Sequence, residues 1–127
     1  MAPAAASAVE LGCGTGVLAV ASALATAAAN DVADRVTVIR DDAASSLAEG
    51  CTDLVVLNPP FHVGATVHSG VALRLFADAA RVLRPGGELW VVWNSHLMYR
   101  PVLERIVGPT RQIARNAKFT VTVSTKP

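Results

Sequence analysis

The residues best suited to chemistry are a carboxamide, two prolines and an aromatic ring in direct succession, Asn58, Pro59, Pro60 and Phe61. They follow the apolar run 54–57, which indicates a buried strand that ends at the prolines. Proline fixes its own φ and keeps the preceding residue out of helical geometry, so Asn58 should be extended on a stiff loop. The Asn58 side-chain oxygen and the Pro59 carbonyl can accept hydrogen bonds, and Phe61 can stack on a ring. The loop therefore suits a planar ring with an amino group; a plain turn with Phe61 in the core is the alternative.

A glycine-rich turn follows a second strand-like run, Val-Glu-Leu at 9–11, and precedes a helix-compatible segment, 17–29. Glycine lets the backbone approach a ligand closely. The carboxylate before the turn suits a cationic or amine-bearing ligand better than a pyrophosphate. The spacing, Gly-x-Gly-x-Gly, also differs from the dinucleotide fingerprint, so a nicotinamide enzyme is a distant alternative, and a plain tight turn is another. The residues of a ligand loop here would be Glu10, Gly12, Cys13, Gly14 and Gly16.

The two motifs, each at a strand end, resemble those of class I S-adenosylmethionine-dependent methyltransferases. Residues 10–16 are similar to motif I, and residues 58–61 to motif IV of the branch that methylates amino groups. A narrower resemblance, to the ribosomal RNA guanine-N2 methyltransferases of the small- and large-subunit type, extends over most of residues 8–125. Its motifs lie at 60–62, 72–76, 79–92 and 94–97.

The resemblance implies S-adenosylmethionine as the cofactor and methyl donor. The glycine turn and Glu10 would hold it, and Asn58 would lie beside it. Asp42 resembles motif III, where a carboxylate accepts a hydrogen bond from the adenine amine, with Asp41 as its neighbour and substitute. The alternative for Asp42 is a helix N-cap for residues 43–49.

The resemblance also implies the acceptor, the 2-amino group of a guanine in ribosomal RNA. Asn58 and Pro59 would accept hydrogen bonds from this group, and the catalytic set would be Asn58, Pro59, Pro60 and Phe61. The base would contact Phe61 and His62, and also Asn94 and His96, which follow a later strand. For His96 we expect a positioning role, since methyl transfer to an amine needs little acid–base help.

One feature departs from the family. Between motif I and the strand expected at 35–40, family members carry a helix, a second strand that ends in an acidic residue, and another helix. The acidic residue grips the ribose of the cofactor. Here about 19 residues separate Gly16 from Arg35, room for one helix and little more. Either the unit is lost, or the sequence joins two segments of a longer protein near residues 17–30, which is the preferred interpretation.

Chain length indicates one domain over 1–127. Family members usually carry a further amino-terminal domain, so the resemblance implies that the sequence is a fragment. No apolar run is long enough to cross a membrane, no signal peptide is recognisable, and Cys13 and Cys51 form neither a disulfide framework nor a metal site with the histidines. We therefore expect a cytoplasmic protein without a metal and without a membrane partner. The net charge of +1 hides an asymmetry, because residues 100–127 hold six Lys/Arg and one acidic residue. This end could steer RNA, or it could be an ordinary solvated face.

Strand and helix patterns alternate, which predicts a Rossmann-like α/β fold: a mostly parallel sheet with helices on both faces and a carboxyl-terminal antiparallel hairpin. Helices are expected at 17–30, 70–83 and 98–107, strands at 53–57 and 88–93, and the hairpin at 111–115 and 119–125, with Phe119, Val121 and Val123 alternating on one face. Ribosomal RNA or a ribosomal subunit is the expected partner, and the oligomeric state is open. Rival functions are amino methylation of adenine or of a protein glutamine, and a non-catalytic RNA- or protein-binding module.

Overall fold

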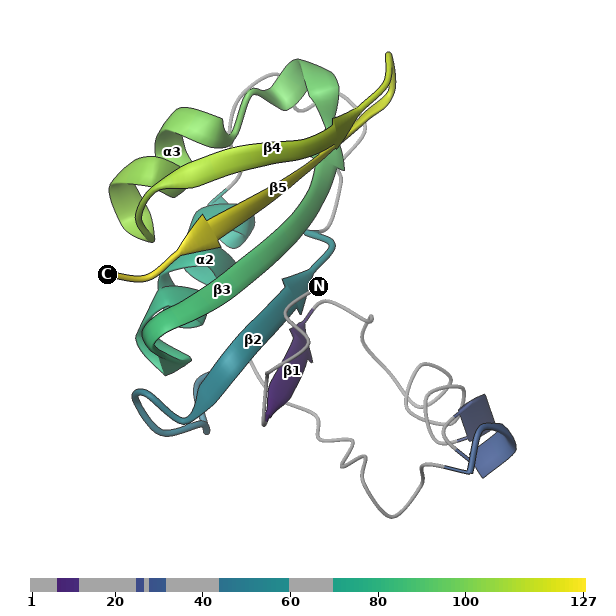
Figure 1. Ribbon diagram of the computed structural model, residues 1–127, viewed down its shortest axis with the longest axis vertical. Coiled ribbons are helices and arrows are strands. Elements are labelled where there is room, and N and C mark those ends of the chain that lie inside the picture. The colour runs from purple at the N-terminus through teal and green to yellow at the C-terminus, as the bar shows by residue number, and fades with distance from the viewer. Residues whose placement is uncertain (1–6, 12–24, 27, 32–43, 60–69) are drawn as a thin grey trace.

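A computed structural model describes residues 7–11, 25–26, 28–31, 44–59 and 70–127. Its strands form one sheet in the order β1-β2-β3-β5-β4 (Figure 1). The first three, β1 (Ala8–Leu11), β2 (Thr52–Leu57) and β3 (Leu83–Asn94), run parallel. β5 (Phe119–Thr125) pairs antiparallel with β3, and β4 (Thr110–Arg115) antiparallel with β5. The predicted sheet with its antiparallel hairpin is confirmed.

Two helices, α2 (Gly70–Val82) and α3 (Arg100–Ile106), pack against one face of this sheet. α2 buries an apolar stripe that includes Leu75, Phe76 and Ala79, and it passes behind β3 and β5 in Figure 1. The stripe meets the alternating core residues of the central strands, such as Leu57 and Val91. What covers the opposite face lies outside the described residues, as do the strand expected at 35–40 and most of the helix expected at 17–30.

The start of β3 differs from the expectation. The expected helix at 70–83 and strand at 88–93 leave residues 84–87 between them, yet β3 begins at Leu83 directly after the helix. Thr52 pairs with Leu83 and Leu54 pairs with Glu88, so residues 84–87 bulge out of the ladder with Gly86 at φ +85°. The glycine-containing turn is therefore built into the strand as an irregularity.

The alternation expected around Phe119, Val121 and Val123 does not match the burial along β5. The structure buries Thr120, Thr122 and Ser124 beside Trp93, Val91 and Leu89, and it leaves Phe119 42% exposed. Hydroxyl groups can be buried here because each has a partner. The Trp93 indole donates to Thr122 Oγ1 over 3.2 Å, and Thr110 Oγ1 lies 2.7 Å from Ser124 Oγ.

α3 is shorter than the helix expected at 98–107. Between β3 and α3 lies a 3₁₀ turn, η2 (Ser95–Leu97), and Met98 then takes a left-handed conformation with φ 54°. The helix can begin only after this residue, at Arg100. Within the described part of the chain, no helix has the length and apolar character needed to cross a membrane, and no cluster of potential metal ligands occurs.

Candidate active site

Asn58 and Pro59 stand at the carboxyl end of β2. Val55 and Leu57 on this strand are buried in the core, and Asn58 is the first exposed residue after it. The strand stops here because Pro59 has no N–H to donate to a ladder. The carboxamide is thus placed at the sheet edge where open α/β sheets bind ligands.

The glycine-rich segment leaves the sheet next to this point. β1 runs parallel to β2 and its last residue, Leu11, pairs with Leu57, the last residue of β2. Gly12 is bonded to Leu11 and Asn58 to Leu57, so the chain enters both motifs at the same edge of the sheet. Of the predicted donor-binding residues, Glu10 is described only as part of the β1 backbone, and the others, Gly12, Cys13, Gly14, Gly16, Asp41 and Asp42, lie outside the described residues.

β3 continues the same edge further out. Val91 pairs with Leu57, so Asn94 lies three residues beyond the end of β2, and η2 follows directly. Asn94 is extended, with φ −66° and ψ 126°. It pairs across the ladder with Phe119, the first residue of β5, which brings the carboxyl-terminal hairpin to the same place.

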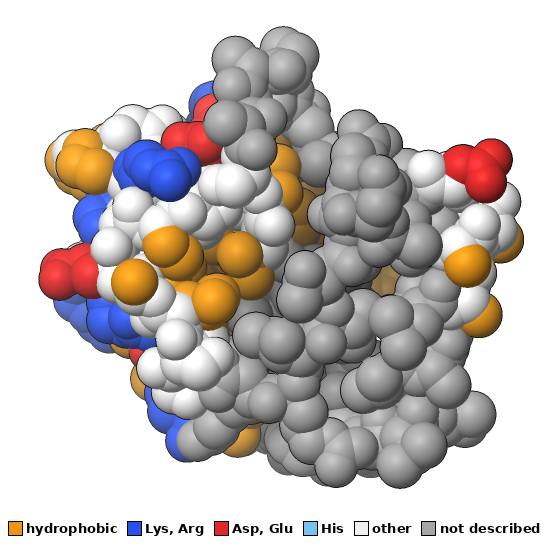
Figure 2. Space-filling model, turned by 90° about the horizontal axis from the view of Figure 1, so that it is seen from below, with side chains coloured by type: hydrophobic (Ala, Val, Ile, Leu, Met, Phe, Trp, Pro, Cys, Tyr) orange, Lys and Arg blue, Asp and Glu red, His pale blue; other side chains and the backbone are white. Residues whose placement is uncertain are grey.

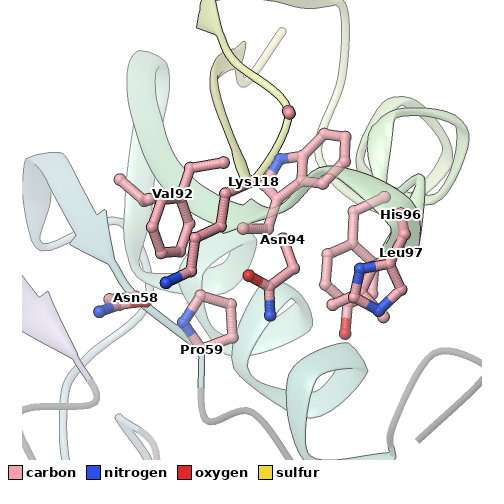
Figure 3. Close-up of a pocket in the computed structure, with 11 residues that line it drawn as sticks. Asn58, Pro59, Val92, Asn94, His96, Leu97 and Lys118 are labelled. Atoms are coloured by element: carbon pink, nitrogen blue, oxygen red, sulfur yellow. The ribbon is translucent and has the colours of Figure 1, made fainter.

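A cavity of about 830 Å³ joins these strand ends (Figure 3). Its walls come from the two residues that follow β2, from the end of β3 with η2, and from the turn between β4 and β5. In Figure 3 the Asn94 carboxamide and the Lys118 side chain both extend into the space beside Pro59. The described lining consists of Asn58, Pro59, Val92, Trp93, Asn94, His96, Leu97, Tyr99, Ala117, Lys118 and Phe119.

The buried Ser95 attaches the β4–β5 turn to the end of β3. Its N–H donates to the Lys118 carbonyl over 2.9 Å, and its hydroxyl donates to the Asn116 carbonyl over 3.0 Å. Because the one hydroxyl proton is used in that bond, the contact of 2.8 Å with Thr120 must be donated by the Thr120 hydroxyl. Three hydrogen bonds thus hold one wall of the cavity against another.

Aromatic rings make the inner wall stiff. Tyr99 packs edge-on against Phe76, with ring centroids 5.2 Å apart, and against Trp93 at 5.8 Å. Both Tyr99 and Trp93 are almost fully buried yet reach the lining. Edge-to-face contacts of this kind add stability beyond the buried area. The wall opposite the Asn58 loop is therefore preorganised.

The charge of the described lining is one-sided. It contains the Lys118 ammonium and no carboxylate among the described residues, and the His96 imidazole adds a hydrogen-bonding group. Neutral hydrogen-bonding groups come from Asn58 and Asn94, together with the Tyr99 hydroxyl. The described lining offers hydrogen-bonding groups to a planar polar ring, and Lys118 offers a positive charge to an anion.

The structure brings together four of the residues that the sequence proposed: Asn58, Pro59, Asn94 and His96. Pro60, Phe61 and His62 lie outside the described residues. Sequence reasoning missed Tyr99, which follows η2, and the turn residues Lys118 and Phe119. The available signals were the basic carboxyl-terminal segment that contains Lys118, and the position of Tyr99 shortly after a predicted strand end.

An open α/β sheet whose parallel strands end at a polar cavity defines the class of domains that bind a ligand at this edge. Comparison with known proteins narrows this class. The family model of the methyltransferase small domain matches residues 18–123. The chain belongs to the methyltransferase small domain family.

Two relatives of this chain are named as ribosomal RNA methyltransferases. A Streptomyces coelicolor protein named ribosomal RNA large subunit methyltransferase G is 40% identical over 93% of this chain, and its Pseudomonas aeruginosa PAO1 namesake is 37% identical over 90%. The chain spans 37% and 36% of these relatives, a little over a third of their length.

Among solved structures, the chain resembles the T. thermophilus 16S rRNA N2 G1207 methyltransferase (RsmC) in complex with AdoMet and guanosine. The TM-score is 0.80 and the identity 30%, over 94% of this chain and 37% of that one. A ribosomal protein L11 methylase from Lactobacillus delbrueckii subsp. bulgaricus has a TM-score of 0.63 over 94% of this chain and 69% of its own, but only 16% identity. This second likeness shows the shared fold alone.

The relatives also contain residues that this chain lacks. The alignment with the Streptomyces coelicolor protein has 139 positions but uses 93% of 127 residues, which is about 118, so about 20 positions stand opposite gaps in this chain. The Pseudomonas aeruginosa alignment, with 135 positions over 90% of the chain, leaves a similar excess. A mean strand and a mean helix together need about 17 residues. The excess thus has the size of one strand with one helix, the kind of unit that the sequence led us to expect as absent near residues 17–30.

Proposed function

We propose that the chain is the methyl-transferring part of an S-adenosylmethionine-dependent enzyme that methylates the 2-amino group of a guanine in ribosomal RNA. The observation that carries this proposal is the shared cavity of Asn58, Pro59, Asn94 and His96 in a methyltransferase small domain. The guanosine complex of the T. thermophilus relative supports guanine as the acceptor. Because the chain spans little more than a third of its relatives, ribosomal RNA as the substrate belongs to the proposal.

The described residues suit the acceptor side of this reaction. The Asn58 side-chain oxygen and the Pro59 carbonyl accept hydrogen bonds from the 2-amino group and so keep its nitrogen lone pair out of the ring. The nitrogen would then attack the methyl carbon in line with the carbon–sulfur bond of the donor, which breaks as the carbon–nitrogen bond forms. Positioning of this kind supplies most of the catalysis. The base must leave its stack or loop to reach the cavity.

The assignment of the methyl-donor site rests on the sequence and on the register of β1 with β2. S-adenosylmethionine, when bound, supplies an electrophilic methyl group on a sulfonium. We assign its binding to a carboxylate and glycine set that would lie beside Asn58: Glu10, Gly12, Cys13, Gly14 and Gly16, with Asp41 and Asp42 for the adenine. The positive charge of the sulfonium suits a site beside the carboxylate of Glu10 on β1 better than a site beside a lysine.

Replacing Asn58 tests the proposal. Asn58→Ala should lower single-turnover methyl transfer to ribosomal RNA by about 100-fold or more, since a preorganised polar contact at the reacting group is lost. Calorimetry should show S-adenosylmethionine binding close to that of the wild type. Gln112→Ala, an exposed carboxamide on β4, is the matched control and should leave both values unchanged. Unchanged turnover in Asn58→Ala would remove the proposed chemistry.

A non-catalytic binding module is the second candidate, and the roughly 20 unmatched positions favour it. The resemblance places the ribose-gripping acidic residue in that missing unit. The same calorimetry separates the two functions, because a module that has lost the donor site gives no heat with S-adenosylmethionine. Adenine or a protein glutamine remains the rival acceptor, and identification of the methylated product decides between them.

A further inference from the structure

We propose that Lys118 binds a backbone phosphate of the RNA next to the acceptor base, and that Phe119 holds the lysine in place for this contact. The inference rests on the proposed function and deepens it, because it makes the substrate a phosphate-bearing nucleotide chain. It rests on the placement of two residues in the β4–β5 turn and on the charge around them.

The backbone of Lys118 is held at both of its polar groups. Its N–H donates to Asn116 Oδ1 over 2.8 Å, and its carbonyl accepts from the Ser95 N–H over 2.9 Å. Asn116 Oδ1 also accepts from the Phe119 N–H over 2.7 Å. The turn is therefore fixed to the end of β3, and little backbone entropy is lost when Lys118 binds a ligand.

The side chain is directed as well. The Lys118 ammonium lies 5.2 Å from the centroid of the Phe119 ring, a cation–π distance. Phe119 is 42% exposed, lines the cavity and pairs with Asn94 across the ladder. In Figure 3 the amine extends from the turn toward the Asn58 loop. The aromatic ring thus supports a positive charge at the cavity instead of contributing to the core.

This charge has no acidic partner among the described residues. The ion pairs found there are Arg81–Asp78, Arg84–Asp53 and Arg100–Glu104. Figure 2, a view from below, shows basic and acidic side chains interspersed on the left side of the view. The described cavity lining, in contrast, includes no carboxylate, so the described residues place no negative charge beside Lys118 that would repel an anion.

The anion that fits is a phosphate of the nucleotide chain. A base that leaves its stack carries its own sugar and flanking phosphates with it, so an acceptor amine at Asn58 brings a phosphate to the cavity mouth. A glutamine acceptor would bring no such group. Free guanosine also lacks the phosphate, whereas guanosine 5′-monophosphate has one, and this difference makes the contact measurable.

The test compares Lys118→Ala with Lys118→Arg and with a matched control, Arg115→Ala. Arg115 is exposed on β4 of the same hairpin and is not part of the described lining. Fluorescence anisotropy measures binding of a guanosine-containing RNA oligonucleotide at several salt concentrations, and calorimetry compares guanosine with guanosine 5′-monophosphate. Circular dichroism verifies that each variant is folded.

Lys118→Ala should weaken RNA binding by about five- to tenfold and reduce the salt slope of log K by about 0.7, as expected for one lost phosphate contact on a single strand. It should remove the preference for the monophosphate over guanosine, and Lys118→Arg should restore it. Phe119→Leu, which keeps the apolar bulk but removes the ring, should give a partial loss, and Phe119→Tyr should give none.

The inference is overturned if Lys118→Ala and Arg115→Ala weaken binding equally, if the monophosphate preference survives in Lys118→Ala, or if the wild-type chain does not bind RNA. Its failure is distinguishable from that of the proposed function. A wild-type chain that binds RNA through Lys118 but transfers no methyl group refutes the function alone, and methyl transfer with an unaltered salt slope in Lys118→Ala refutes the inference alone.

Discussion

Two carboxamides, Asn58 and Asn94, stand at the ends of adjacent parallel strands and line one cavity together with His96. An amide oxygen can accept a hydrogen bond without carrying charge, so it can orient an amine without protonating it. The imidazole of His96 is exposed, and the transfer needs no strong base, because the proton of the alkylated amine can pass to water. These residues therefore position the acceptor.

His96→Gln tests this positioning role. We expect a loss in single-turnover methyl transfer of less than about tenfold, since glutamine keeps a hydrogen-bonding side chain, whereas a lost general base typically costs about 100-fold or more. The pH–rate profile of the variant should keep the shape of the wild-type profile. A hundredfold loss of methyl transfer, together with the disappearance of the acidic limb from the pH–rate profile, would show that His96 acts as a general base.

For single residues, the sequence predicts a position in the fold where that position follows from the neighbouring residues in the chain. Asn58 and Pro59 follow an apolar run that stops at prolines, and Asn94 and His96 follow another apolar run, so their position at strand ends can be inferred from their neighbours. Lys118 and Phe119 reach the cavity only because β5 pairs with β3, with Phe119 opposite Asn94. No sequence pattern around residue 118 indicates the register of β5 with β3. The excess of basic residues at the carboxyl-terminal end was the signal that pointed to a role for Lys118.

At the scale of elements, a row of hydroxyl groups joins the carboxyl-terminal hairpin to the rest of the fold. Thr120, Thr122 and Ser124 lie on the buried face of β5, where an apolar strand would be the simple expectation. Each has a partner in Ser95, Trp93 or Thr110. The strands could be predicted from turns and β-branched residues, but the buried face could not, because threonine and valine have similar strand preferences and only the tertiary partners decide.

Ser95→Ala and Ser124→Ala separate stability from site geometry. The first removes a buried hydroxyl that pairs with this row and the second removes one from the row itself, and each should lower the free energy of unfolding by about 1–3 kcal/mol in urea denaturation. Only Ser95 holds the β4–β5 turn, so Ser95→Ala alone should weaken RNA binding in the folded protein. Equal effects of the two changes on RNA binding would show that Ser95 acts through stability alone.

At the scale of the whole molecule, one end of a parallel sheet gathers the motifs that the sequence spreads over more than 100 residues. β1 and β2 end together, and β3 extends the edge to the hairpin. Alternating strand and helix patterns predicted this sheet, since parallel strands need crossover connections. The absence of a strand-and-helix unit near residues 17–30 stays a prediction from chain length, and the excess of about 20 aligned positions in the relatives has the size of such a unit.

The position of the methyl group in the product tests the central claim most directly. Ribosomal RNA is incubated with S-adenosylmethionine and the protein, and its nucleotides are mapped by mass spectrometry beside a reaction with Asn58→Ala. We predict one additional guanosine methylated on N2 in the wild-type reaction and none with Asn58→Ala. A methyl group on adenine or on a protein, or no product from a wild-type chain that binds the donor, would contradict the account.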